Sequence, residues 1–227
     1  AMALLSMAMP FTAKAQDKVE ASVGVDLVSG YVWRGQDLGG EAPAERIIAY
    51  KGFSLGAWGS VGIESSDTKE FELNWDIQPE VQRISDGYWY NVTGDGVTAK
   101  YFQYGAHNAA NSHLFEAQIG YDFGPVAVTG TPTLQATTVL TKTVTVLFIL
   151  HLRSSSLHTG RTGLDGEIGA TPWATDFYGA NGFAVCDVSL GVSKDIKITD
   201  SFSLPLFAKA TWNPRSEGAY FVVGLSF

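Results

Sequence analysis

The sequence ends Gly218-Ala219-Tyr220-Phe221-Val222-Val223-Gly224-Leu225-Ser226-Phe227, a stretch that alternates between apolar and mixed positions. Successive side chains of a strand point to opposite faces, so Phe221, Val223, Leu225 and Phe227 share one face. The other face carries Tyr220 and the smaller residues that follow it. An amphipathic last strand that ends on an aromatic residue favours an outer-membrane β-barrel, and the last strand of a soluble sandwich is the alternative.

Composition supports a strand-rich protein. The 227 residues include 25 Gly, 13 Phe, 9 Tyr and 6 Trp, and only 17% are charged. The formal net charge of -8 argues against a nucleic-acid partner, because phosphate binding needs clustered basic residues and the 15 Lys and Arg are scattered. The single cysteine, Cys186, cannot form an internal disulfide and is expected to be an apolar wall residue.

The first residues have the character of an export signal. An apolar stretch from Ala1 to Phe11 precedes Ala13-Lys14-Ala15, the small-x-small pattern of a signal-peptidase site. A basic n-region is missing, so a short buried helix is the alternative. We expect residues 1–15 to be the remnant of a signal peptide and residues 16–227 to form one outer-membrane β-barrel domain.

Strand lengths favour the membrane. Beginning with the alternating segment Val19 to Arg34, the pattern predicts twelve strands, most of them close to the ~9 to 11 residues that a tilted transmembrane strand needs. The other predicted strands are 44–50, 53–63, 70–79, 81–91, 113–123, 126–136, 140–152, 163–171, 182–197, 202–212 and 218–227. Loops alternate between long and short, as in outer-membrane barrels, except on both sides of 140–152. The expected fold is an all-β, antiparallel, up-and-down transmembrane barrel of about 12 strands.

One segment departs from the alternation. No acidic residue occurs between Asp122 and Asp165, and the run Val146-Leu147-Phe148-Ile149-Leu150 is apolar at every position. Three interpretations remain open for residues 130–163: a strand buried on both faces or packed against a plug, an inserted hydrophobic hairpin, or a local sequence irregularity.

The inward faces of such a barrel would be acidic. If the apolar faces point to lipid, the lumen-facing candidates are Asp26, Arg34, Glu70, Glu72, Asp76, Glu116, Asp122, Asp187 and Lys209, together with Glu20, Asp165, Glu167, Asp195 and Lys197. An acidic lumen favours cations if a continuous water path exists, whereas the same carboxylates could fill a closed interior as ion pairs. We expect Arg34 to pair with Asp26, Glu70 or Asp76, since a buried charge needs a partner.

Catalytic and metal sites are not expected. His107 and His113 lie in or beside the segment 92–112, but no nucleophile elbow surrounds any serine, and two histidines alone do not make a metal site. The sequence therefore predicts no enzyme activity and no cofactor.

Asp26-Leu27-Val28-Ser29-Gly30-Tyr31-Val32-Trp33-Arg34-Gly35 resembles the Ser-x-Tyr-x-x-Arg-Gly element of the TorF-type porin family. Ala49 to Leu55, Tyr101 to Gly105, Ile168 to Trp173 and the end from Gly182 are similar to Bacteroides-type outer-membrane members of that group. The resemblance implies a Gram-negative outer-membrane location and a porin for small solutes or ions, with a closed structural or partner-binding barrel as the alternative.

The end of the chain also resembles the signal that barrel-assembly machinery reads, carried by Phe221, Val223, Leu225 and Phe227. The expected partners are therefore outer-membrane lipid and that machinery, with an envelope protein as a further candidate.

Overall fold

The structure is a computed structural model, and part of the chain is described in it. The described residues are 19–39, 41–50, 53–62, 69–77, 82–92, 113–123, 126–135, 145–154, 162–200 and 202–227. The predicted signal peptide, residues 1–15, and most of the predicted loop 92–112 with His107 lie outside the described residues. Within the described part, no helix combines the length and the apolar character needed to cross a membrane.

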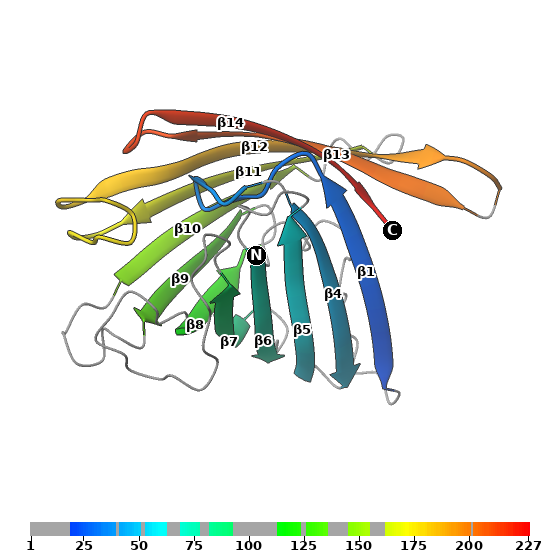
Figure 1. Ribbon diagram of the computed structural model, residues 1–227, viewed down its shortest axis with the longest axis horizontal. Coiled ribbons are helices and arrows are strands. Elements are labelled where there is room, and N and C mark those ends of the chain that lie inside the picture. Colours follow the sequence, from blue (N-terminus) through cyan, green and yellow to red (C-terminus); the bar gives the residue numbers. More distant parts are fainter. Residues whose placement is uncertain are drawn as a thin grey trace.

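The described strands form one closed antiparallel barrel and one small inner hairpin (Figure 1). The hairpin consists of β2 (Val32–Trp33) and β3 (Gln36–Asp37). The wall strands are β1 (Glu20–Val28), β4 (Glu41–Tyr50), β5 (Phe53–Gly62), β6 (Lys69–Ile77), β7 (Gln82–Val92), β8 (His113–Asp122), β9 (Val126–Gln135), β10 (Thr145–Ser154), β11 (Thr162–Thr171), β12 (Ala184–Lys197), β13 (Ser203–Asn213) and β14 (Gly218–Ser226). Each wall strand pairs with its neighbour along the chain, which confirms the predicted all-β, antiparallel, up-and-down architecture.

The last strand closes the ring against the first. Leu225 lies opposite Leu27 in an antiparallel register. The backbones of Phe227 and Val25 exchange two hydrogen bonds, with N to O distances of 2.9 and 3.2 Å. On its other side, β1 pairs with β4. The terminal strand and the first strand thus form the closing contact of the ring.

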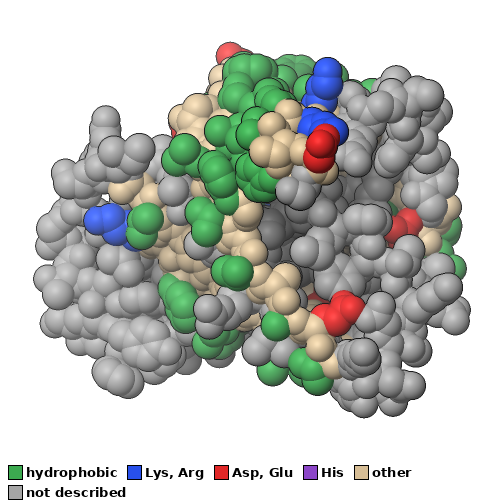
Figure 2. All heavy atoms as spheres, turned by 90° about the vertical axis from the view of Figure 1, so that its right-hand side faces the viewer, with side chains coloured by type: hydrophobic (Ala, Val, Ile, Leu, Met, Phe, Trp, Pro, Cys, Tyr) green, Lys and Arg blue, Asp and Glu red, His purple; other side chains and the backbone are tan. Residues whose placement is uncertain are grey.

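The barrel is apolar outside and polar inside. Phe221, Ile119 and Val23 are 68%, 68% and 69% exposed, whereas Glu116 of β8 and Asp187 of β12 are buried. Seen from the right-hand side of Figure 1, hydrophobic side chains gather over the upper part of the molecule (Figure 2). A soluble protein buries its large apolar side chains and leaves charges exposed, so this distribution is the reverse of the usual one.

The first strand ends earlier than its alternation predicts. β1 stops at Val28, and the chain then turns into the barrel instead of continuing to Arg34. Tyr31 and Trp33, which a strand continued to Arg34 would place on the apolar outer face with Val23 and Val25, are instead buried in the interior. The Ser29 N–H still donates to the Val223 carbonyl of the wall, whereas the Tyr31 N–H donates to the Gly39 carbonyl within the inner segment, so the chain leaves the wall between these two residues.

The irregular apolar segment is a wall strand packed against an internal loop. In β10, Leu147 and Ile149 are buried and contact Tyr178 and Cys186, whereas Phe148 is 50% exposed. Both faces are apolar because one meets the exterior and the other meets this inner cluster. Of the three interpretations, a strand against a plug is the one that the structure supports. The strand lies at Thr145–Ser154, several residues later than predicted.

Candidate functional site

The inner hairpin is built around two residues with left-handed backbone conformations. Val32 pairs with Asp37 and Trp33 with Gln36, which leaves Arg34 and Gly35 as the two turn residues. Their φ angles are 49° and 78°, the positive values that a type I′ hairpin turn requires. Glycine adopts this conformation readily, whereas arginine is strained in it by about 1 kcal/mol or more. Contacts of the Arg34 side chain must therefore hold the turn in place.

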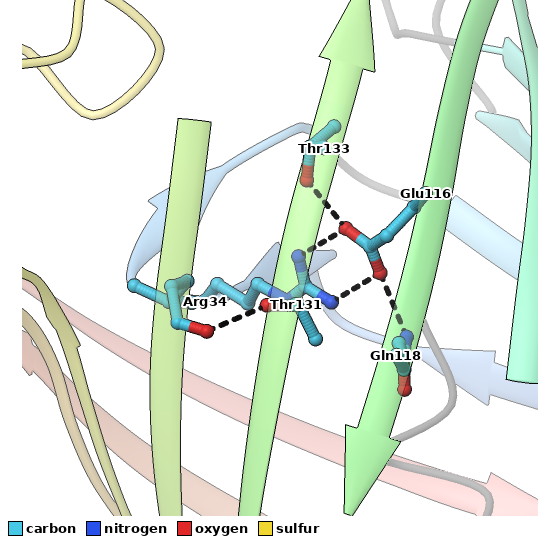
Figure 3. A network of polar contacts seen from close by, with 6 residues as sticks. Arg34, Glu116, Gln118, Thr131 and Thr133 are labelled. Atoms are coloured by element: carbon cyan, nitrogen blue, oxygen red, sulfur yellow. Dashed lines mark hydrogen bonds and ion pairs between the residues drawn. The ribbon is translucent and has the colours of Figure 1, made fainter. Parts of the chain in front are cut away.

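Those contacts are made with Glu116, across the lumen on β8 (Figure 3). Arg34 donates two hydrogen bonds, from Nη1 to Oε2 and from Nη2 to Oε1, both at 2.6 Å. Thr133 Oγ1 and Gln118 Nε2 each donate a further hydrogen bond to the same carboxylate at 2.7 Å. The guanidinium also lies 4.3 Å from the ring centroid of Trp33. The carboxylate thus accepts four hydrogen bonds, which is the arrangement that a buried ion pair needs.

The charge of Arg34 is stabilised by this site. Its burial disfavours the charged form, but the attraction of Glu116 and of Tyr178, together with their hydrogen bonds, outweighs that penalty and raises the pKa of Arg34 above its ordinary value. Arg34 therefore remains a cation throughout the accessible pH range, and Glu116 is the group that neutralises it.

Apolar contacts tie the hairpin to two further walls. Tyr31 and Trp33 form a cluster with Trp58 of β5, with the Tyr31 and Trp58 ring centroids 5.6 Å apart. On the other side, Val32 packs with Phe207 and Val222 of β13 and β14. Figure 1 shows the hairpin between these two groups of strands. The hairpin thus crosses the interior from one wall to the opposite one.

A second loop, residues 172–183, packs on the hairpin. Gln36 Nε2 donates a hydrogen bond to the carbonyl of Phe177 at 2.8 Å, and the Phe177 ring meets Trp33 edge to face at 6.0 Å. Tyr178 follows and lies in the cluster with Leu147 and Cys186. Burial raises the pKa of Tyr178 to about 12, so its hydroxyl is neutral at physiological pH. The hairpin and this loop are therefore packed against each other inside the barrel.

Gly35 fixes the depth of the hairpin, and its replacement by alanine should loosen it. A Cβ on Gly35 would lie 1.9 Å from the carbonyl oxygen of Cys186, and its φ of 78° adds strain. We expect Gly35→Ala to lower the free energy of unfolding by about 2 kcal/mol or more, measured by urea titration in detergent micelles. The hydrogen bond that Asn213 Nδ2 donates to the Gly35 carbonyl at 2.9 Å would be distorted as well.

Two other glycines separate the causes of this effect. Gly179 has a φ of 60° and open space around it, so Gly179→Ala reports backbone strain alone. Gly182 has open space and no positive φ, so Gly182→Ala should change stability little. A Gly35→Ala variant no less stable than Gly179→Ala would show that the close approach to Cys186 is unimportant.

The predicted lumen-facing residues fall into two groups. Those that the structure buries are Asp26, Arg34, Glu72, Asp76, Glu116, Asp187 and Lys209. Glu70 and Asp122 are half-buried. The prediction that Asp26, Glu70 or Asp76 neutralises Arg34 is wrong, because the chain turns inward before Arg34 and carries it to Glu116.

Other predicted residues are also placed. Trp58 and Phe207 are buried inside the barrel and pack against the hairpin. Glu20 is exposed and so is Lys197, which pairs with Asp200 at 2.6 Å outside the barrel, so neither is an interior charge. The exposed face of β14 carries Phe221 and Val223, followed by Phe227, while Leu225 is half-buried.

A second polar network lies on β11 to β13. Ser189 Oγ donates to Asp187 Oδ1 at 2.5 Å, and Ser189 Oγ and Thr211 Oγ1 share a hydrogen bond at 2.8 Å. Glu167 and Lys209 are buried beside these residues and interact electrostatically with Asp187. Two carboxylates and one ammonium group thus share this wall.

Several contributors to the interior were not anticipated from the sequence. Thr131 and Thr133 of β9 are buried, and Ser60 and Ser85 are buried on β5 and β7. All four occupy inward positions of alternating strands, so their orientation was available from the period of two. Their part in the polar interior could not be predicted from the sequence, because short hydroxyl side chains are common on both faces of strands.

No protein-family model matches the sequence, and a search of curated proteins finds no match. Solved structures do resemble the fold. One, described as "Unveiling the Mechanism Behind the in-meso Crystallization of Membrane Proteins", is 7% identical, covers 92% of this chain and 83% of its own, and gives a TM-score of 0.51. The KdgM porin is 10% identical over 92% of this chain and 98% of its own, with a TM-score of 0.47. A mutant Rh. blastica porin is 12% identical to this chain. The match covers 84% of this chain and 56% of the porin, with a TM-score of 0.41. With 7% identity and a TM-score of 0.51, the first of these structures shows that the fold is shared and nothing more.

Proposed function

We propose that the closed sheet is a twelve-stranded barrel that spans the bacterial outer membrane. The reversed polarity supports this proposal, because apolar side chains cover the outside of the wall while carboxylates are buried within it. In hydrocarbon every backbone group needs a partner, and the pairing of β1 with both β4 and β14 leaves no open edge. Outer-membrane lipid is then the solvent for the exposed face, and the alternating end of β14 is the segment offered to barrel-assembly machinery.

We further propose that the barrel is a channel for small cations or small neutral solutes. One observation carries this proposal: of the buried charged residues that the structure describes, six are acidic and two are basic, namely Asp26, Glu72, Asp76, Glu116, Glu167, Asp187, Arg34 and Lys209. Fixed charges inside a low-dielectric wall attract counterions and repel ions of the same sign. The expected substrate class is therefore cationic or uncharged, and no catalytic role is proposed.

Conductance in planar lipid bilayers tests this function. The refolded barrel should produce discrete current steps, and a salt gradient across the bilayer should give a reversal potential of the sign expected for cations. Liposome swelling in small sugars provides a parallel measure of solute flux. A folded barrel that passes neither ions nor solutes would contradict the channel, and an anion-selective current would contradict the assignment of the interior charge.

A closed, non-conducting barrel is the second candidate. It is favoured by the inner hairpin, which contacts β5 through Trp58, β8 through Glu116 and the β13–β14 wall through Phe207. In that case the barrel would act through the loops at its hairpin end, as a structural element or as the docking site of an envelope protein. Absence of current from the intact protein, with current gained when the hairpin is removed, would identify this case.

A further inference from the structure

Strands β12 and β13 extend past both of their neighbours at the end of the wall where β14 ends. β11 begins at Thr162, opposite Lys194, and β14 pairs with β13 no further than Leu206. Beyond these points β12 and β13 stay paired with each other for three more residues on each strand. Figure 1 shows this hairpin projecting at the right beyond the other strands. We call it the projecting hairpin, and its described residues are 195–200 and 202–205.

One face of the projecting hairpin is apolar. Ile196, Ile198 and Phe202 are 40%, 56% and 49% exposed, and the Ile198 N–H donates to the Phe202 carbonyl at 3.0 Å. Ile196 and Ile198 continue the row of alternate positions that carries the exposed Leu190 and Val192 of β12. The apolar face of the hairpin is therefore an extension of the apolar outer face of the wall.

The other face is polar. Asp195 and Lys197 occupy the alternate positions of β12, and Ser203 lies opposite Lys197. Lys197 also forms the exposed ion pair with Asp200 in the turn. In Figure 2, which views this end of the molecule, basic and acidic side chains lie beside the gathered hydrophobic ones. The projecting hairpin is thus an amphipathic two-stranded ribbon.

Two requirements restrict where such a ribbon can lie. Its exposed isoleucine and phenylalanine side chains gain free energy on leaving water. Its edges, however, lie beyond the ends of β11 and β14, so among the described strands they have no partner there. Unpaired backbone groups are costly in hydrocarbon and need water. Only the interface between lipid and water, where an amphipathic element can bury one face, meets both requirements.

Lys194 marks the level of that interface. It is exposed and lies on the outward row, between Val192 and Ile196. A charged side chain is costly within hydrocarbon, whereas the long stem of a lysine can carry its ammonium group to the lipid headgroups. The hydrocarbon therefore ends close to the point where the hairpin leaves the wall.

We infer that the projecting hairpin lies on the phospholipid leaflet at this end of the barrel. Ile196, Ile198 and Phe202 enter the upper part of the acyl chains, Lys194 meets the phosphates, and Lys197 faces water. The inference rests on the proposed outer-membrane location and holds for an open and a closed barrel alike. The hairpin would anchor the barrel to lipid outside its ring of strands.

Nitroxide labels test this contact in barrels refolded into vesicles of phosphatidylethanolamine and phosphatidylglycerol. Every variant carries Cys186→Ala, which removes the single native cysteine, and one label is attached through Ile198→Cys, Lys197→Cys or Leu190→Cys. The accessibility of each label to oxygen, which concentrates in hydrocarbon, is compared with its accessibility to a water-soluble nickel complex. The oxygen-to-nickel ratio should be highest at Leu190 in the wall and lower at Ile198. It should be several-fold lower again at Lys197, the matched neighbour on the polar face.

The wall label separates failure of this contact from failure of the membrane location. A high ratio at Leu190, with equally low ratios at Ile198 and Lys197, would overturn the inference and leave a membrane-spanning barrel. Low ratios at all three positions would contradict the proposed location as well. Spectral broadening between Ile198 labels that disappears on dilution with unlabelled protein would show that a second copy covers the apolar face, and would also overturn the lipid contact.

Discussion

Replacing residues 31–38 with a short Gly-Ser linker should raise the single-channel conductance several-fold. These residues contribute Tyr31, Val32, Trp33 and Arg34 to the interior, all of them buried. Side chains fill the inside of eight-stranded barrels, whereas 16-stranded barrels hold an aqueous channel, so a barrel of intermediate size depends on what its loops place inside. The linker spans the gap because Tyr31 N and the Gly39 carbonyl already lie within hydrogen-bond distance.

The size of this effect distinguishes the two candidate functions. A channel should conduct before the deletion and conduct more after it, whereas a closed barrel should conduct only after it. The control is the turn between β12 and β13, where replacing the exposed residues Thr199 and Asp200 leaves the interior untouched and should not change conductance. If the deletion leaves the conductance of a folded, conducting barrel unchanged, the hairpin is not the constriction.

Breaking the Arg34–Glu116 pair should destabilise the folded barrel by about 3 kcal/mol, because removing one partner leaves a buried charge without compensation. Glu116→Gln and Arg34→Met each remove one charge from a pair whose side chains are 1% and 5% exposed. The free energy of unfolding is measured by urea titration of the protein in detergent micelles. The hairpin should also loosen, so both variants should show larger and noisier currents than the wild-type protein.

The double variant Arg34→Met/Glu116→Leu identifies the cause. Two apolar side chains of similar size leave no unpaired charge, and such replacements are often close to neutral. The double variant should therefore be more stable than either single variant. Additive losses in the double variant would show that the two residues act independently. Lys197→Met, which breaks the exposed pair with Asp200, serves as the surface control and should have little effect.

The prediction of the wall succeeded because it used a local signal. In β14, β6 and β8 the alternation of side chains fixed both the strand and the side that each residue faces, since orientation follows from a period of two. The strand bounds agree within a few residues for most of the wall. Closure between the chain end and the first strand is what a barrel in hydrocarbon requires, because no sheet edge can remain open there.

The antiparallel wall, its apolar exterior and its inner carboxylates are predictable from the sequence alone, because these features depend on residues adjacent in the chain. The departure of the chain from the wall after Val28 and the pairing of Arg34 with Glu116 are visible only in the folded protein. The folded protein also shows why Leu147 and Ile149 are apolar on the inner face, where they contact Tyr178. Those outcomes depend on how far a loop reaches into a closed barrel, and the period of two carries no information about contacts across the lumen.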